Sequence, residues 1–332
     1  MTEPENLITN TTTPKLRNST GSVLPFGAQL TLNILAVIII FIGLVGNAVV
    51  FWFLFVKIKR NQCTVYILNL AVADFTFLVG CAIYLMFFLF YLCGVKVTES
   101  DNEKVFFAGN LLYDIGFNTS TFVLTAISVE RFVSVLLPIW HRCHRPKWQS
   151  TAISAVLWAL SVLVTGLETF LCQNSDKYQE PGSGKCTAVY LFTSGLFLLT
   201  VSLMVLSSLT LLLEIRKTSK QCRPLRLYIV IIVTVMVFLL NVVPARVIGL
   251  LLYFKVLPAE VYSLLFFYLT EIFTSIHCSM NPYLYILVGR WRKQGPGVTV
   301  KQAFEKVFKE DTESTWQTEA TSMSSITGSK HR

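Results

Sequence analysis

The polar and charged residues of this chain are gathered into short intervals, and these intervals separate seven long apolar runs. The runs are residues 28–56, 65–93, 105–137, 151–172, 188–215, 227–254 and 261–288. Each run meets the roughly 20 residues that a helix needs to cross a bilayer core. Because backbone groups find no water partners in hydrocarbon, runs of this length must be helical. The pattern predicts an all-α membrane protein in which seven transmembrane helices form a bundle.

Composition supports this fold class and excludes several others. Apolar residues make up 53% of the chain and charged residues only 14%, with a mean hydropathy of +0.59. A soluble domain carries about 25% charged residues. We find no internal repeat of the kind that transporters show, and no metal cluster or nucleophile constellation that would indicate an enzyme. The chain is therefore not expected to be an enzyme or a transporter.

The basic residues of the intervals predict how the helices are oriented, because cytoplasmic loops hold the excess of Lys and Arg. Three alternate intervals carry basic residues and no acid, and their basic residues are Lys57, Lys59, Arg60, Arg142, Arg145, Lys147, Arg216, Lys217, Lys220, Arg223 and Arg226. The other intervals mix both charges, so we expect an extracellular N-terminus and a cytoplasmic C-terminus at the plasma membrane. The net charge of +9 then lies beside anionic lipid and does not indicate nucleic acid.

The N-terminal segment, residues 1–27, is expected to be an extracellular tail. It is too polar for a cleavable signal peptide, and the apolar run that follows is too long for one. Two glycosylation sequons begin at Asn10 and Asn18. Their predicted position outside the cell makes both asparagines candidate glycosylation sites.

The C-terminal segments follow the seven-helix domain, residues 28–288. Residues 289–310 predict a short amphipathic eighth helix on the membrane surface, because Val300, Phe304 and Phe308 recur at helical spacing. Residues 311–332 are polar, rich in Ser and Thr, and expected to be disordered. Phosphorylation by receptor kinases and recruitment of arrestin are hypotheses for this tail.

Two of the eight cysteines flank the second extracellular interval. A bridge between Cys172 and Cys186 would connect the fourth helix to the fifth in an oxidising compartment. Cys93, at the extracellular end of the second helix, is an alternative partner. The sequence favours the first pairing and leaves the second open.

Five short motifs fall in successive helices in a fixed order. They are Gly46-Asn47, Leu70-Ala71-Val72-Ala73-Asp74, Glu130-Arg131-Phe132, Trp158 and Asn281-Pro282-Tyr283-Leu284-Tyr285. Together they resemble the rhodopsin-like G protein-coupled receptors. Within that group the chain is similar to the Mas-related receptors through two longer stretches, residues 125–131 and 137–147. That family also bridges the fourth and fifth helices.

The resemblance implies a cell-surface receptor that activates heterotrimeric G proteins, and it assigns the residues of activation. Arg131, beside Glu130, is implied to contact the G protein when the helices move. Asn281-Pro282 in the seventh helix and Pro244 in the sixth are expected hinges, and Tyr285 lies toward the cytoplasmic end. Most rhodopsin-like receptors place a tryptophan two residues before this second proline. The chain has Val242 there, and Mas-related receptors also lack the tryptophan.

The resemblance also implies a cation site in the middle of the bundle. In rhodopsin-like receptors the residues matching Asp74, Ser120 and Asn281 hold a sodium ion that is linked to the inactive state. Oxygen ligands suit such an ion, but His277 and Cys278 stand where many relatives have Asn and Ser. A hydrated polar network without an ion is the alternative. We expect no other metal and no cofactor.

Glu168 is the first candidate for ligand binding, because it lies one helical turn before Cys172 near the extracellular face. Several Mas-related receptors bind basic peptides and amines through a glutamate at this position, together with a second acid where this chain has Tyr190. The resemblance therefore implies an extracellular ligand with a cationic group, either a peptide or an amine.

Four further residues complete the expected ligand site. Asp114 and Glu271 are acids that could replace the missing second one, with Tyr113 beside them. Arg246 either neutralises one of these acids or meets a ligand carboxylate. Each acid is thus expected either to form an internal salt bridge or to contact the ligand.

One alternative function remains open at this stage. Without the tryptophan before Pro244, the protein could signal constitutively without a ligand, or act as a scaffold that modulates another receptor. The runs Phe87-Phe88-Leu89-Phe90-Tyr91 and Phe266-Phe267-Tyr268 are expected to face lipid or the membrane interface.

Overall fold

The structure is a computed structural model in which the described residues form α-helices and no strand. It describes residues 25–58, 61–92, 94, 99–137, 146, 148–172, 184–217, 225–254, 256, 264–290 and 302. The helices are α1 (Phe26–Trp52), α2 (Gln62–Leu92), α3 (Glu99–Leu136), α5 (Gln149–Cys172), α6 (Gly184–Lys217), α7 (Leu225–Tyr253) and α8 (Leu264–Arg290). All seven predicted spans are therefore helical, which confirms the seven-helix bundle.

The observed helices extend beyond several of the apolar runs. The third span was expected to begin at residue 105, whereas α3 begins at Glu99 and takes in the polar residues before that run. Hydropathy detects only the part of a helix that must sit in lipid, so a polar extension escapes it. At the end of α1 the helix widens into a π-helical turn, Phe53–Lys57, before the first short connection.

Six of the helices are long and apolar enough to cross a membrane by length and composition. The remaining helix, α8, has 27 residues and is long enough, but it contains Glu271, His277 and Asn281. Each of these three side chains is buried or half-buried. The lower hydropathy of α8 therefore comes from polar side chains that face the protein.

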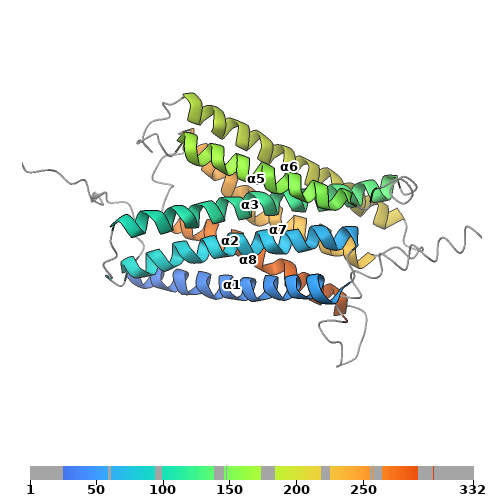
Figure 1. The fold of residues 1–332 in the computed structure, drawn as a ribbon, viewed down its shortest axis with the longest axis horizontal. Coiled ribbons are helices and arrows are strands. Elements are labelled where there is room, and N and C mark those ends of the chain that lie inside the picture. The colour runs from blue at the N-terminus through green and yellow to red at the C-terminus, as the bar shows by residue number, and fades with distance from the viewer. Residues whose placement is uncertain are drawn as a thin grey trace, which may run out of the picture.

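The helices lie side by side along the long axis of the molecule (Figure 1). The order α1, α2, α3 runs across the bundle, and α5 and α6 cover α3 on the far side from α1. The ring closes because α7 contacts both α6 and α8, and α8 contacts α1 and α2. Aromatic and aliphatic side chains such as Phe77, Leu124 and Phe238 fill the interior. Large apolar side chains on the outside, among them Phe41 and Leu287, are exposed as a lipid-facing surface requires.

The closest helix packing joins α2 to α3 at glycines. A methyl group added at Gly80 would lie only 2.5 Å from the backbone nitrogen of Tyr113. One added at Gly116 would meet the backbone of Phe77 in the same way. Small residues allow backbones to approach in membrane bundles, so this glycine seam fixes the position of α3.

Several predictions fall outside the described residues. These are the N-terminal tail with Asn10 and Asn18, the eighth helix over 289–310 apart from its residue 302, and the tail over 311–332. Most basic residues of the predicted cytoplasmic loops also lie there. These expectations stay predictions.

Candidate functional site

A disulfide joins Cys172, the last residue of α5, to Cys186 in the first turn of α6. The Cα atoms of the two cysteines are 4.9 Å apart. The pairing favoured from the sequence is therefore confirmed, and the alternative with Cys93 is not needed. This bond marks one end of the bundle, called the disulfide end below.

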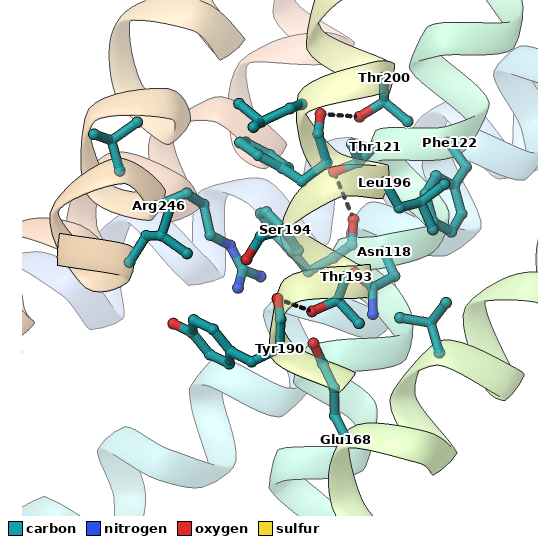
Figure 2. A pocket seen from close by; sticks show the side chains of 16 residues that line it. Asn118, Thr121, Phe122, Glu168, Tyr190, Thr193, Ser194, Leu196, Thr200 and Arg246 are labelled. Atoms are coloured by element: carbon teal, nitrogen blue, oxygen red, sulfur yellow. Dashed lines mark hydrogen bonds between the residues drawn. The ribbon is translucent and has the colours of Figure 1, made fainter. Parts of the chain in front are cut away.

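A pocket lies near the disulfide end, between α3, α5, α6 and α7 (Figure 2). It holds about 700 Å³ of empty space, its open mouth included. The lining residues are Phe117, Asn118, Thr121, Phe122, Val164, Glu168, Tyr190, Thr193, Ser194, Leu196, Phe197, Leu198, Thr200, Arg246, Val247 and Leu250. Half of these residues are apolar and half are polar or charged, so the pocket offers both apolar surface and polar groups that could orient a small ligand or part of a peptide.

Glu168 extends from α5 into this pocket, which Tyr190 lines from α6 (Figure 2). The Glu168 side chain is half-buried. Within the described part of the chain its carboxylate forms no hydrogen bond and no salt bridge. An acid withdrawn from bulk water without a partner is costly, so this carboxylate is available for a cation.

Arg246 enters the pocket from α7 on the opposite side (Figure 2). Its guanidinium carbon lies 4.2 Å from the centre of the Phe117 ring, within the range of a cation–π contact. Arg246 also interacts electrostatically with Asp114 and Glu271. Among the described residues it forms no salt bridge with either acid. The arginine thus sits over an aromatic ring with two acids nearby.

Asp114 and Glu271 lie behind the pocket lining, and each has partners of its own. The amide nitrogen of Asn110 donates to Asp114 Oδ2 at 3.2 Å, and Tyr84 in turn donates to Asn110. Glu271 accepts hydrogen bonds from the Tyr113 hydroxyl and from the Cys81 thiol, the latter at 3.6 Å. The structure therefore brings three predicted ligand residues into the pocket, Glu168, Tyr190 and Arg246. It places Asp114, Tyr113 and Glu271 in a polar cluster beside it.

A second polar cluster occupies the middle of the bundle around Asp74. Ser120 donates to Asp74 Oδ1 at 2.6 Å, and Asn281 donates to Asp74 Oδ2 at 2.7 Å. The Cys278 thiol bonds the same carboxylate. Asn47 of α1 fastens this part of α8 by donating to the Cys278 carbonyl at 3.1 Å. The three residues predicted to hold sodium are thus in direct contact.

The fit of this cluster to a sodium ion can be judged from its donors. Asp74 and Ser120 supply oxygens, and the buried Oδ1 atom of Asn281 has no hydrogen-bond partner among the described residues. Hard cations take such oxygen ligands. These donors suit such an ion; Asp74, Ser120 and Asn281 would hold it, and it would supply positive charge beside the aspartate.

Of the predicted activation residues, Glu130, Arg131 and Tyr285 lie toward the helix ends opposite the disulfide. Arg131 on α3 is buried, with 4% of its surface exposed, and Glu130 beside it is half-buried. Tyr285 on α8 is also buried. Pro282 and Pro244 each lie inside a continuous helix, α8 and α7 respectively. A proline there leaves a carbonyl without its helical partner, which permits bending.

The helix α7 differs from the others in how it is held. Within the described residues, no side chain of α7 hydrogen-bonds to another helix. Its Phe238 packs against Phe197 of α6 and, edge-on at 5.2 Å between centroids, against His277 of α8. Val242, one turn further, is buried at 1% exposure. Packing and the Arg246 contact therefore hold α7 in place.

Three hydrogen-bonded pairs between helices were missed from the sequence. Asn33 donates to the Tyr268 hydroxyl at 2.8 Å, the Trp158 indole donates to Asn69 at 3.0 Å, and Asn118 donates to Thr165 at 3.1 Å. The expectation that the aromatic run ending at Tyr268 faces lipid is wrong for this residue, which is 1% exposed. The signal that could have indicated each pair is a polar residue inside an apolar span.

Comparison with known proteins agrees with this geometry. The model of the family described as "7 transmembrane receptor (rhodopsin family)" matches residues 46–285, which span all five motifs. Proto-oncogene Mas of Homo sapiens is 37% identical over 278 residues, 81% of each chain. Mas-related G-protein coupled receptor member H of Rattus norvegicus is 39% identical over 278 residues, 83% of each chain. Member D of Homo sapiens is 35% identical over 292 residues, 86% of this chain and 87% of that one.

Proposed function

Because the chain belongs to the Mas-related branch of the rhodopsin-like G protein-coupled receptors, we propose that it responds to a cation-bearing extracellular ligand by activating heterotrimeric G proteins. The family makes it a multi-pass receptor of the cell surface and not an enzyme. The ligand we propose is a basic peptide or an amine. One observation carries this choice: the Glu168 carboxylate enters the pocket without a partner among the described residues.

The charge around the pocket supports a positive ligand group. Among the described residues of the pocket and of the polar cluster beside it, Glu168, Asp114 and Glu271 are acidic and Arg246 is basic. Charges attract more strongly in a site shielded from water than on an open surface. A ligand with a cationic group would meet Glu168 first, because the other two acids lie behind the lining.

The proposed orientation puts the pocket outside the cell. A disulfide at Cys172 and Cys186 suits the oxidising exterior, and basic residues gather in the connections at the opposite end. Arg131 and Tyr285 would then face the G protein. Glycosylation of Asn10 and Asn18, and contacts of the 311–332 tail with receptor kinases and arrestin, belong to the same proposal.

Sodium is part of the proposal as a stabiliser of the resting receptor. Its support is the oxygen set of Asp74, Ser120 and Asn281 described above. These residues connect α2, α3 and α8, so an ion among them would oppose movement of α8.

The test is G protein activation in cells that express the receptor, with and without a panel of basic peptides, amines and acidic metabolites. We expect at least one cationic compound to activate the receptor, and Glu168→Gln to remove that response. Glu99→Gln, which removes the same charge at the start of α3, is the matched control and should leave the response intact. A cation response that survives Glu168→Gln would refute the role of this carboxylate.

A second candidate function is ligand-independent signalling, alone or as a modulating scaffold. It is favoured by Val242 in place of tryptophan and by the absence of hydrogen bonds from described α7 side chains to other helices. A high basal signal that neither the panel nor Glu168→Gln changes would establish this alternative.

A further inference from the structure

Of the described residues that line the pocket, only Arg246 is basic, and it lines the side opposite Glu168 (Figure 2). Its guanidinium stacks on Phe117, 4.2 Å from the ring centre. Asp114 precedes Phe117 by three residues on α3, so both lie on the same helical face. Yet Arg246 is exposed to the pocket and not enclosed. A small molecule in the pocket can therefore reach it.

Arg246 lies close to the point where a proline permits α7 to bend. It follows Pro244, the proline inside this helix, by two residues. Val242 precedes Arg246 by one turn and therefore shares its face, but valine is too small to bridge to α3 as a tryptophan could. Described α7 side chains form no hydrogen bond to other helices, so among the described residues the contact of the Arg246 guanidinium with the Phe117 ring is the charged contact from α7 to α3.

We propose that Arg246 is an internal cation that holds α7 against α3 in the resting receptor, and that the cationic group of a ligand activates the receptor by displacing it. This inference rests on the proposed function, since it requires a cationic ligand. Phe117, with Asp114 and Glu271 nearby, forms the site that Arg246 occupies, called its seat below. The half of α7 beyond Pro244 is the element that the displacement releases.

Competition follows from simple electrostatics. Two cations held a few ångströms apart repel each other, so Arg246 and a ligand cation cannot both lie against Phe117 at low cost. When Arg246 leaves, α7 loses its charged contact with α3. The helix can then bend at Pro244 without breaking a hydrogen bond between a described α7 side chain and another helix.

The opposite role for Arg246 is contact with a ligand carboxylate, and the two roles differ in sign. If Arg246 binds an anionic group of the ligand, replacing Arg246 weakens the binding of that ligand. If Arg246 is the internal cation, removing it makes cations more potent and also raises the signal without ligand.

The first experiment compares Arg246→Gln with wild type for basal G protein activation, normalised to receptor at the cell surface. A cation–π contact at an exposed arginine corresponds to roughly a two- to fivefold change in equilibrium, so we expect basal activation to rise within that range. Arg246→Lys keeps the charge but loses the planar group and should give a smaller rise. Lys185→Gln removes a positive charge from an exposed lysine at the start of α6, outside the pocket lining, and should change nothing. An unchanged or lower basal signal in Arg246→Gln overturns the proposal.

Phe117→Leu tests the same contact from α3 and remains informative if the arginine variants fail to reach the surface. It removes the ring while keeping an apolar side chain of similar bulk. We expect it to raise basal activation as Arg246→Gln does, and the double variant to add little to either single change. Fully additive effects in the double variant would show that the two residues act separately, against the proposal.

Chemical rescue separates loss of an internal cation from general damage. Membranes that contain Arg246→Ala are assayed for nucleotide exchange on added G protein, with guanidinium chloride or with urea, a neutral molecule of the same shape. Guanidinium should refill the seat and lower the raised basal signal, whereas urea should not. Equal effects of both compounds, or none, would contradict the proposal.

Failure of this inference is distinguishable from failure of the proposed function. If Glu168→Gln abolishes the cation response but Arg246→Gln has a normal basal signal, the proposed function is supported and the role of Arg246 as an internal cation is refuted. Cation insensitivity of both wild type and Arg246→Gln removes the proposed function, and with it the displacement step.

Discussion

The glycine seam between α2 and α3 allows a sharp prediction for Gly80→Ala. The added methyl group would lie 2.5 Å from the Tyr113 nitrogen, 2.8 Å from its Cα and 2.9 Å from the Gly109 carbonyl oxygen. All three are backbone atoms, which cannot rotate away as the end of a side chain can. Ordinary contact begins at 3.4 Å, so the helices must separate by most of an ångström.

Overpacking of this kind costs about 1–3 kcal/mol, and the separation of two backbones belongs at the upper part of that range. Alanine returns roughly 1 kcal/mol through its better helix propensity. We therefore expect Gly80→Ala to lower the stability of the folded receptor by about 1–2 kcal/mol. A shift of α3 would also pull Tyr113 away from Glu271, so the polar cluster beside the pocket should be disturbed as well.

The assay is thermal unfolding of the purified receptor in detergent, with Gly195→Ala as the matched control. A methyl group at Gly195 in α6 would meet no atom within 4 Å, so this change should leave the apparent Tm equal or slightly higher. Gly80→Ala should lower it. If the two variants unfold at the same temperature, α2 and α3 do not pack at the seam as described.

Three further predictions concern the polar core, the disulfide and the aromatic contacts of α7. Replacing sodium by potassium should raise basal activation of the wild type, and Asp74→Asn should abolish that difference; a sodium effect that persists in the variant would refute the ion site. Replacing Cys172 and Cys186 together by serine should lower the free energy of unfolding by about 3 kcal/mol, as expected when a disulfide that closes a loop of this length is lost. A Tm of this variant equal to that of the reduced wild type would confirm that no other pairing replaces the bond. Phe238→Leu and His277→Asn should each shift basal activation, with an interaction of roughly 0.5–1.5 kcal/mol in the double variant, whereas strict additivity would mean that the two rings are not in contact.

Much of the fold could be predicted from the sequence because the bilayer imposes one simple demand. A span of apolar residues must be helical, so the seven runs determined the seven helices. The weak points were the ends, as at Glu99, where a helix continues into water and no longer needs apolar residues. The motifs then supplied the family, since their order is too specific to arise by composition alone.

The candidate site could be predicted only in part. Glu168 and Arg246 were found because ionisable side chains are costly inside apolar spans and are therefore functional candidates. That Arg246 stacks on Phe117, and does not pair with Asp114 or Glu271, depends on how α3, α7 and α8 pack together. An apolar ring in an apolar span gives no signal in the sequence that a cation lies over it.

Partners across helices were equally hidden. Asn33 in α1 stood out as polar, but its partner Tyr268 is 235 residues further along the chain. A single sequence contains no information that links two such positions. The run before Tyr268 looked lipid-facing because aromatic residues are common at membrane interfaces, and that general preference was overruled by one hydrogen bond.

The bonding of α7 has a consequence for how easily this helix can move. Hydrogen bonds act along fixed directions, whereas apolar contacts keep most of their strength when surfaces slide past one another. The described side chains of α7 make apolar contacts with the neighbouring helices, whereas hydrogen bonds join α1, α2, α3 and α8 to one another. Small displacements of α7 should therefore cost little, and its position should depend on the shape of the surfaces packed against it more than on bonds of fixed direction.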